Sequence, residues 1–335
     1  MSKIHPPFDP DVAAALVAIN GVLPSSITPE LIGRLREVTE AGHTLSLEEI
    51  RRHVHADEMT VPGPAGDAEV PLLVMRPHGS DPAVRLPGLY FIHGGGMVAG
   101  TNRTGVDWAL AWMAEISMAV VSVDYRLAPE HPHPAPVEDC YAGLEWVGSH
   151  VGELGIDPDR LVIAGGSAGG GLAAAMALLA RDRGGPGVRA QMLICPMLDD
   201  RAITPSSTEL VGEGVWDSIS NATGWSALLG PAAGGPGVSP YAAPARATDL
   251  SGLPTAFVEA GAVETFRDES VDYASRIWQA GGQAELHIWP GGCHGFDEVI
   301  PEAPLAREAR AARLNWLRRV LSEDHRAAAL RPGVR

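Results

Sequence analysis

Two hydrophobic patterns alternate along the chain from about residue 58 onward. Seven short runs are apolar or alternate between apolar and polar residues, a pattern typical of strands. These runs lie at residues 69–75, 86–92, 119–124, 161–164, 191–196, 255–260 and 284–289. Apolar residues recur at helical spacing over residues 107–116, 136–149, 171–182, 267–280 and 304–321. The alternation predicts an α/β fold, with a mostly parallel central sheet and helices on both faces.

Two segments interrupt this alternation. Residues 1–55 contain helical patterns before any strand, and residues 200–245 fall between two core strands. Ligands of open α/β sheets bind beyond the carboxyl ends of the strands. We therefore expect one domain over residues 1–335, with a core of 56–199 and 246–324. The two interrupting segments are expected to form a helical cap over the carboxyl edge of its sheet.

Composition narrows the range of partners. The chain has 335 residues, 45% of them hydrophobic, and a formal net charge of −16, which disfavours nucleic acid and anionic membrane surfaces. Its three cysteines are odd in number and widely spaced, which argues against a disulfide framework. The apolar stretch near the N-terminus is too short to span a membrane and follows proline and aspartate instead of a basic region. We expect a cytoplasmic protein with no nucleic-acid or membrane partner.

One serine stands at a predicted junction between strand and helix. The sequence LVIAGGSAGGGLAAAMALLA over residues 161–180 begins as a buried strand and continues as a run of strong helix formers. Gly165 to Gly169 fit the pattern GxSxG, in which a tight turn exposes the serine hydroxyl above a helix N-terminus. Ser167 is therefore a candidate nucleophile, although a GxSxG match alone is also typical of a plain turn.

A glycine run follows an earlier predicted strand. His93-Gly94-Gly95-Gly96 comes directly after the run at 86–92, where successive backbone N–H groups can face a ligand. Attack on an ester carbonyl places negative charge on its oxygen. The N–H groups of this glycine run and of Ala168 are therefore expected to form an oxyanion hole.

A general base and its acidic partner are sought after the serine in chain order. His294 lies in a glycine-flanked loop after the last predicted strand and is the candidate base. Glu264 and Asp268 both follow the preceding strand. Glu264 is favoured, because a loop residue can turn toward His294, whereas Asp268 is expected to begin a helix as a cap or first-turn charge.

Other candidates for chemistry are set aside. Cys293 is adjacent to His294, and adjacent side chains point in different directions, so a Cys–His nucleophilic pair is disfavoured. The histidine pair 131 and 133 lies in a proline-rich loop, and the pair 53 and 55 lies in a helical context where such positions share no face. No metal and no cofactor are expected. Trp216 and Trp225 either line a pocket or anchor the cap.

Five ordered motifs now support a resemblance. HGGG, DYRLAPEHPHPAPVEDCYAGLEWV, GGSAGGG, the RDE element and HGF together resemble the hormone-sensitive-lipase family of α/β-hydrolases, over about residues 60–320. Its bacterial carboxylesterases, which include heroin esterase, are the most similar group. The resemblance implies a serine esterase for small, short-acyl esters that acts through an acyl-enzyme. It implies the following site residues: a triad of Ser167, Glu264 and His294, with oxyanion donors Gly94, Gly95 and Ala168.

The chain departs from the family pattern at two positions. Gly166 stands where the family usually has aspartate or glutamate, and Glu264 stands where it usually has aspartate. Glutamate is one methylene longer but can still accept a hydrogen bond from the imidazole.

Three further points stay open at this stage. A non-catalytic small-molecule receptor on the same scaffold is one alternative, although the plant gibberellin receptor, which resembles this family, lacks the histidine that His294 supplies here. An amidase or a lactonase is another alternative, because all acyl transfers use the same groups. A homodimer is expected only by resemblance.

Overall fold

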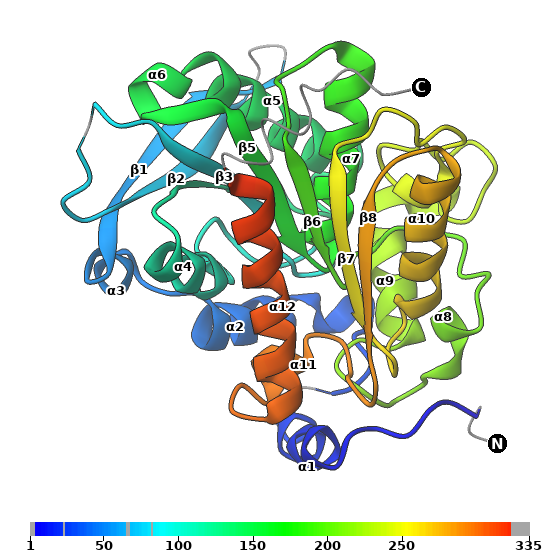
Figure 1. Cartoon of the computed structure of the whole chain (residues 1–335). Coiled ribbons are helices and arrows are strands. Elements are labelled where there is room, and N and C mark those ends of the chain that lie inside the picture. Colours follow the sequence, from blue (N-terminus) through cyan, green and yellow to red (C-terminus); the bar gives the residue numbers. More distant parts are fainter. Residues whose placement is uncertain (1–3, 23, 65–67, 82, 323–335) are drawn as a thin grey trace.

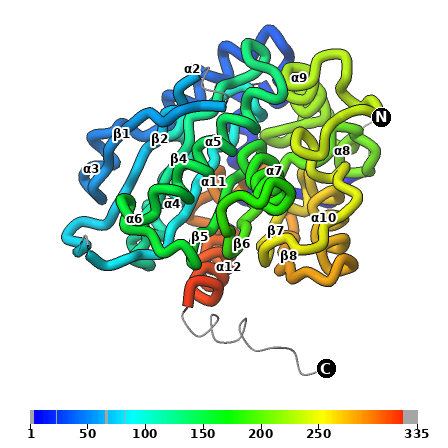
Figure 2. The backbone as a smooth tube through the Cα atoms, turned by 90° about the horizontal axis from the view of Figure 1, so that it is seen from above, coloured from blue at the N-terminus to red at the C-terminus, as the bar shows by residue number. Residues whose placement is uncertain are grey.

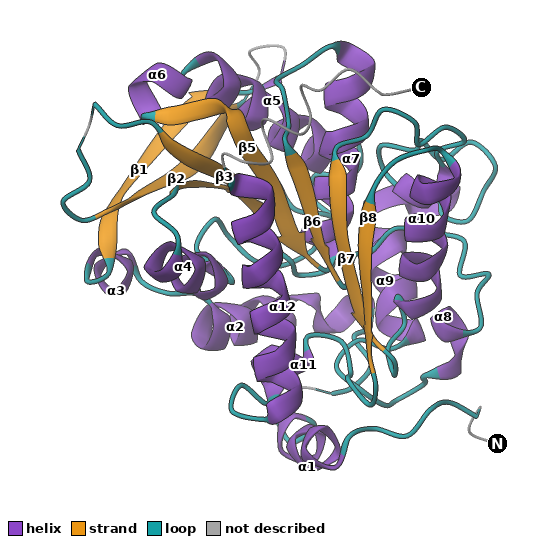
Figure 3. Cartoon of the chain, viewed as in Figure 1, coloured by secondary structure: helices purple, strands orange, loops and turns teal. Residues whose placement is uncertain are grey.

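A computed structural model describes residues 4–22, 24–64, 68–81 and 83–322. Its centre is an eight-stranded sheet with the strand order β1-β2-β4-β3-β5-β6-β7-β8 (Figure 3). The strands are β1 Val54–Pro62, β2 Glu69–Pro77, β3 Leu86–Ile92, β4 Ala119–Val123, β5 Ile156–Gly166, β6 Ala190–Ile194, β7 Thr255–Gly261 and β8 Ala284–Trp289. Six strands, β3 to β8, run parallel to one another, and β2 is antiparallel to both β1 and β4. The predicted α/β fold with a mostly parallel sheet is therefore confirmed.

The first strand differs from the sequence-based expectation. Residues 1–55 were expected to contain only helices, but β1 begins at Val54 and pairs along its whole length with β2. Its polar residues lie at a sheet edge, where exposed positions interrupt the apolar alternation. His55 consequently lies on a strand, so the reason given above for setting aside histidines 53 and 55 was wrong. Neither histidine belongs to a group of three or more possible metal ligands among the described residues.

Helices cover both faces of the sheet (Figures 1 and 2). One face carries α4 Val106–Glu115 and α12 Pro304–Leu321, whose tryptophans join one buried cluster. The other carries α5 Ala135–Ser149, α7 Ala168–Arg183 and α10 Arg267–Gln279, which join a second cluster. The short helices α3 Leu47–Arg51 and α6 Val151–Leu154 flank β1 and β5, and α11 Phe296–Val299 precedes α12. The apolar faces of these helices thus bury the sheet from both sides.

Two segments lie at the carboxyl edge of the parallel strands. The first contains α1 Pro10–Ile19, the 3-10 turn η1 Pro29–Leu31 and α2 Ile32–His43; the second contains α8 Ser206–Glu209 and α9 Ser218–Leu229. We call residues 10–43 and 206–229 the cap segments. They contact each other, because Ile27 N donates to Ser220 Oγ (2.8 Å) and Ser26 Oγ donates to Asp217 Oδ2 (2.6 Å). Figure 1 shows both segments near the arrowheads of β5 to β8.

The rest of residues 200–245 is irregular and includes the 3-10 turn η3 Gly230–Ala232, and η4 Pro244–Arg246 follows. No helix in the described ranges combines the length and the apolar character needed to cross a bilayer.

Candidate active site

Ser167 lies in the sharp turn between β5 and α7. Its backbone has φ +57° and ψ −122°, a strained conformation for a residue with a side chain. The turn depends on its glycines. A β-carbon at Gly165 would lie 2.3 Å from Gly169 O, and one at Gly169 would lie 2.0 Å from Ile92 O. Because these glycines have no side chains, the strand, the turn and the helix can approach this closely, and the tight turn fixes the position of the serine.

His294 and Glu264 reach the serine from the ends of β8 and β7. His294 Nε2 lies 2.9 Å from Ser167 Oγ, and His294 Nδ1 lies 2.8 Å from Glu264 Oε2. An ionised carboxylate only accepts hydrogen bonds, so Nδ1 donates to Glu264 and Nε2 is left to accept from the serine hydroxyl. Glu264 is fully buried and His294 is 8% exposed. The Phe266 ring and the imidazole pack nearly perpendicular to each other, with a centroid distance of 5.2 Å.

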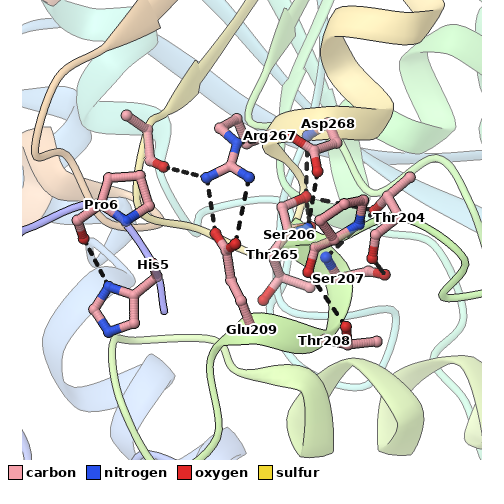
Figure 4. Close-up of polar contacts among 12 residues, drawn as sticks. His5, Pro6, Thr204, Ser206, Ser207, Thr208, Glu209, Thr265, Arg267 and Asp268 are labelled. Carbon is pink, nitrogen blue, oxygen red and sulfur yellow. Dashed lines mark hydrogen bonds and ion pairs between the residues drawn. The ribbon is translucent and has the colours of Figure 1, made fainter. Parts of the chain in front are cut away.

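Asp268 has different partners. It is the second residue of α10, and its carboxylate accepts hydrogen bonds from Ser206 N (2.8 Å) and Arg267 Nε (2.7 Å). Arg267 also binds Glu209 on α8, so these charged residues join α10 to a cap segment (Figure 4). Nearby positive charge and hydrogen bonds hold the pKa of the Asp268 carboxyl below its usual value, against the opposing effect of burial. Asp268 therefore lies in the first turn of α10 and binds Ser206 and Arg267. Glu264 is the carboxylate that contacts His294.

The glycine run lies beside the serine. A β-carbon at Gly94 would lie 3.0 Å from Gly166 O and 3.4 Å from Ser167 Cβ, which shows how closely the two backbones approach. Within the described ranges, no group accepts a hydrogen bond from the N–H of Gly94 or Gly95. Ala168 is the first residue of α7, where a helical N–H has no partner within the helix. Three backbone donors therefore lie near the serine without being used elsewhere.

A cavity of about 470 Å³ opens above Ser167. Its wall from the core includes Gly94, Gly95, Trp108 and His294. Seven apolar residues of the cap segments also line it: Ile19, Val22, Ile27, Leu35, Val38, Val215 and Trp216. Such a pocket, mostly apolar with a few polar groups gathered at one point, is typical of a site for a small organic ligand. Trp225, in contrast, lies in the buried core and does not line the cavity.

Trp108 is a pocket residue that the sequence analysis did not identify. Its indole lies over Gly166, where a β-carbon would come within 2.6 Å of the ring. The family's usual acidic side chain at this position therefore has no space here. The guanidinium of Arg313 also lies over the same ring, at 4.9 Å from the ring centroid. The conspicuous Gly166 was the only signal in the sequence for this arrangement.

Two titratable residues that line the pocket were not predicted from the sequence. Cys195 follows β6 and lines the cavity, and burial raises the pKa of its thiol well above the usual value. Glu298 lies on α11, four residues after His294, and burial with Asp297 and Asp107 nearby raises the pKa of its carboxyl to about 8. Neither residue stands in a recognisable motif. The strand order of the sheet brings Cys195 to the cavity, and the short helix after His294 places Glu298 there.

Cys293 is fully buried, and its Sγ lies 3.6 Å from the backbone oxygen of His294. Its thiol forms no contact with Ser167 and is absent from the cavity wall. The structure thus agrees with setting Cys293 aside as a packed residue.

Comparison with known proteins adds a family to this geometry. Residues 89–298 match the family model for the alpha/beta hydrolase fold. The carboxylesterase NlhH of Mycobacterium tuberculosis is 38% identical over 283 residues, which cover 82% of this chain and 85% of the relative. The ethyl acetate hydrolase of Pseudomonas putida is 28% identical over 307 residues, which cover 83% of this chain and 95% of the relative.

Solved structures of esterases are also similar to this chain. The structure of a bacterial heroin esterase superimposes with a TM-score of 0.86 and 39% sequence identity, covering 94% of this chain and 98% of that one. The match to the family model spans more than half of the chain and contains the strand ends that carry Ser167, Glu264 and His294. The chain belongs to the hormone-sensitive-lipase-like family of α/β-hydrolases.

Proposed function

We propose that this chain is a carboxylesterase that hydrolyses small, short-acyl esters through an acyl-enzyme on Ser167. The observation that carries the proposal is the continuous line of hydrogen bonds from Ser167 through His294 to Glu264, at 2.9 and 2.8 Å. It lies at the floor of a mostly apolar cavity. The names of the relatives support the same reaction class.

His294 is the general base and then the general acid in this mechanism. Its Nε2 accepts the hydroxyl proton as Ser167 Oγ attacks the ester carbonyl, and later gives that proton to the departing alkoxide. Glu264 accepts from Nδ1, which fixes the tautomer and stabilises the imidazolium that forms. A water molecule then releases the acid by the same steps in reverse order. Glutamate does the work of the more usual aspartate, because its hydrogen bond to Nδ1 forms at normal length.

The backbone donors stabilise the charge that develops on the substrate. The N–H groups of Gly94, Gly95 and Ala168 are the proposed oxyanion hole, and losing one such donor typically costs about 10² to 10³ in rate. Backbone donors require no reorganisation during the reaction, since the glycine turn and the helix start already hold them in place.

The cavity supports a preference for small esters. A volume of about 470 Å³ accommodates a compact ester but leaves little room for a long acyl chain together with a bulky alcohol. The cap segments supply most of its apolar wall, so we propose that they act as the cap over a single catalytic domain.

The test is hydrolysis of p-nitrophenyl esters of increasing acyl length by the wild type and by Ser167→Ala. We expect the highest kcat/KM on the short esters and a loss of kcat on the order of 10⁶ in the variant. Full activity in Ser167→Ala would refute the mechanism. No turnover by folded wild type would favour the receptor alternative, and faster turnover of matched amides or lactones would make the chain an amidase or a lactonase.

A further inference from the structure

Three side chains able to bind a metal ion meet beside the proposed nucleophile. They are the thiol of Cys195, the carboxylate of Glu264 and the imidazole of His294, and their ligand atoms all lie within 4.8 Å of one another. All three residues are buried, and Cys195 and His294 also line the cavity. An ion entering the cavity can therefore reach the group.

The backbone fixes the thiol in this place. Cys195 has φ +37°, in the left-handed region that residues with a side chain seldom adopt. Its N–H donates to Glu259 O (2.7 Å), and the carbonyl of the preceding Ile194 accepts from Ser167 N (2.8 Å). The cysteine is thus tied both to β7 and to the turn that carries the serine. A strained residue held so firmly near a reactive centre is a reason to look for a role.

Glu264 supplies an independent observation. Its Oε2 accepts from His294, but its Oε1 has no hydrogen-bond partner within the described part of the chain, although the side chain is fully buried. Buried carboxylate oxygens are normally hydrogen-bonded, because an unsatisfied one keeps its full cost of desolvation. Glu264 Oε1 therefore has a free lone pair near the thiol of Cys195 and the imidazole of His294.

We propose that Cys195, Glu264 and His294 form an inhibitory site for thiophilic divalent metal ions such as Zn²⁺ and Cd²⁺. Thiolate and imidazole ligands favour these ions over Mg²⁺ and Ca²⁺, which prefer oxygen ligands only. Zinc binds thiolate, imidazole and carboxylate at about 2.0 to 2.3 Å. Donor atoms within 4.8 Å of one another can converge on one ion at these lengths with small side-chain rotations.

The proposal rests on the catalytic role assigned to His294 in the proposed function. In the resting site the imidazole proton is on Nδ1, facing Glu264. An ion bound at Nδ1 moves this proton to Nε2, and the thiol of Cys195 releases one proton to solvent as it becomes a thiolate. Nε2 is then a donor and can no longer accept the hydroxyl proton of Ser167. Inhibition follows from the wrong tautomer, with no covalent change at the serine.

The experiment measures esterase activity against the concentration of free Zn²⁺ and Cd²⁺. The variants are Cys195→Ala, Cys195→Ser and the control Cys293→Ala, each compared with its own rate without metal. We expect the half-inhibitory concentration to rise at least tenfold in both Cys195 variants, to stay within twofold in Cys293→Ala, and Mg²⁺ to have no effect. Equal sensitivity of the wild type and Cys195→Ser would overturn the proposal, as would an uninhibited wild type.

Binding is also measured without turnover. Co²⁺ in place of Zn²⁺ gives a thiolate-to-metal charge-transfer absorption, which we expect in the wild type and in Ser167→Ala but not in Cys195→Ala. Thermal unfolding of each variant establishes that it is folded. An active enzyme without this absorption would overturn the metal site and leave the esterase intact. A protein with the absorption but no activity on any ester would retain the site and overturn the proposed function.

Discussion

Trp108 lies so close to Gly166 that a β-carbon at this glycine would come within 2.6 Å of the indole ring. The pair explains why this chain lacks the acidic residue that its family usually places before the nucleophile. An aromatic ring occupies the space that the acidic side chain would need, and the wall beside Ser167 is apolar.

Gly166→Ala is therefore expected to destabilise the protein by about 1 to 3 kcal/mol, because the new methyl group overpacks against Trp108. We also expect a lower kcat, because residue 166 directly precedes Ser167 and its displacement would move the nucleophile. Urea unfolding and ester kinetics of Gly166→Ala, Trp108→Ala and the double variant measure the coupling. We expect the double variant to lose less stability than the sum of the single losses, by about 0.5 to 3 kcal/mol. Strictly additive losses would mean that the two residues do not compete for space.

Glu264 and Asp268 offer a matched test of the acid. Glu264→Gln keeps the shape but removes the charge that fixes the His294 tautomer, so kcat should fall by about 10⁴. Asp268→Asn should lower kcat less than about tenfold, because Asp268 contacts Ser206 and Arg267 instead of the imidazole. Steady-state kinetics on one short ester would decide. A larger loss in Asp268→Asn than in Glu264→Gln would reverse the assignment.

Arg313 is expected to be a major contributor to stability. It is 1% exposed and binds Glu259 at 2.5 Å and Asp297 at 2.6 Å, which ties α12 to β7 and to α11. Arg313→Met leaves the buried carboxylate of Glu259 without its cation and leaves Asp297 only the longer ion pair with Arg310 (3.6 Å), so we expect a loss of about 3 to 5 kcal/mol in the free energy of unfolding. The exposed pair of Arg318 and Glu115 is the control, and Arg318→Met should cost no more than about 1 kcal/mol. Equal losses in the two variants would contradict the account.

Glu298 makes stability depend on pH. Burial, together with Asp297 and Asp107, raises the pKa of its carboxyl from an ordinary 4.5 to about 8. Between these two pH values the unfolded chain has lost the proton that the folded protein keeps. The contribution of Glu298 to the free energy of unfolding therefore falls as pH rises, by at most about 1.4 kcal/mol per pH unit. We expect this slope to be smaller in Glu298→Gln, measured by denaturant unfolding from pH 4.5 to 8. An unchanged slope would show that Glu298 ionises normally.

The sequence was most informative where a local pattern has a direct physical cause. Runs of β-branched residues form the buried parallel strands, and the glycines around Ser167 are required by close backbone contacts. The order of the motifs also located three strand ends that the parallel sheet brings together. β1 was missed because its many exposed polar residues hide the alternation. The glycines at the start of α7 likewise hid three residues of that helix.

Side chains that reach the site through packing could not be predicted in the same way. Trp108 comes from α4, and Cys195 follows β6. The distance of each residue from Ser167 along the sequence does not predict proximity to the serine until the strand order is known. Gly166 was visible as a departure from the family, but which residue fills its space depends on how α4 packs on the sheet.

The most direct test of the account is covalent labelling of the nucleophile. The protein is incubated with a p-nitrophenyl alkylphosphonate, and its intact mass and peptide map are measured beside the release of p-nitrophenol. We predict one phosphonyl group per chain, on the peptide that contains Ser167, with a parallel loss of esterase activity and no label in Ser167→Ala. A label on another residue, or full inactivation without a label on Ser167, would contradict the central claim.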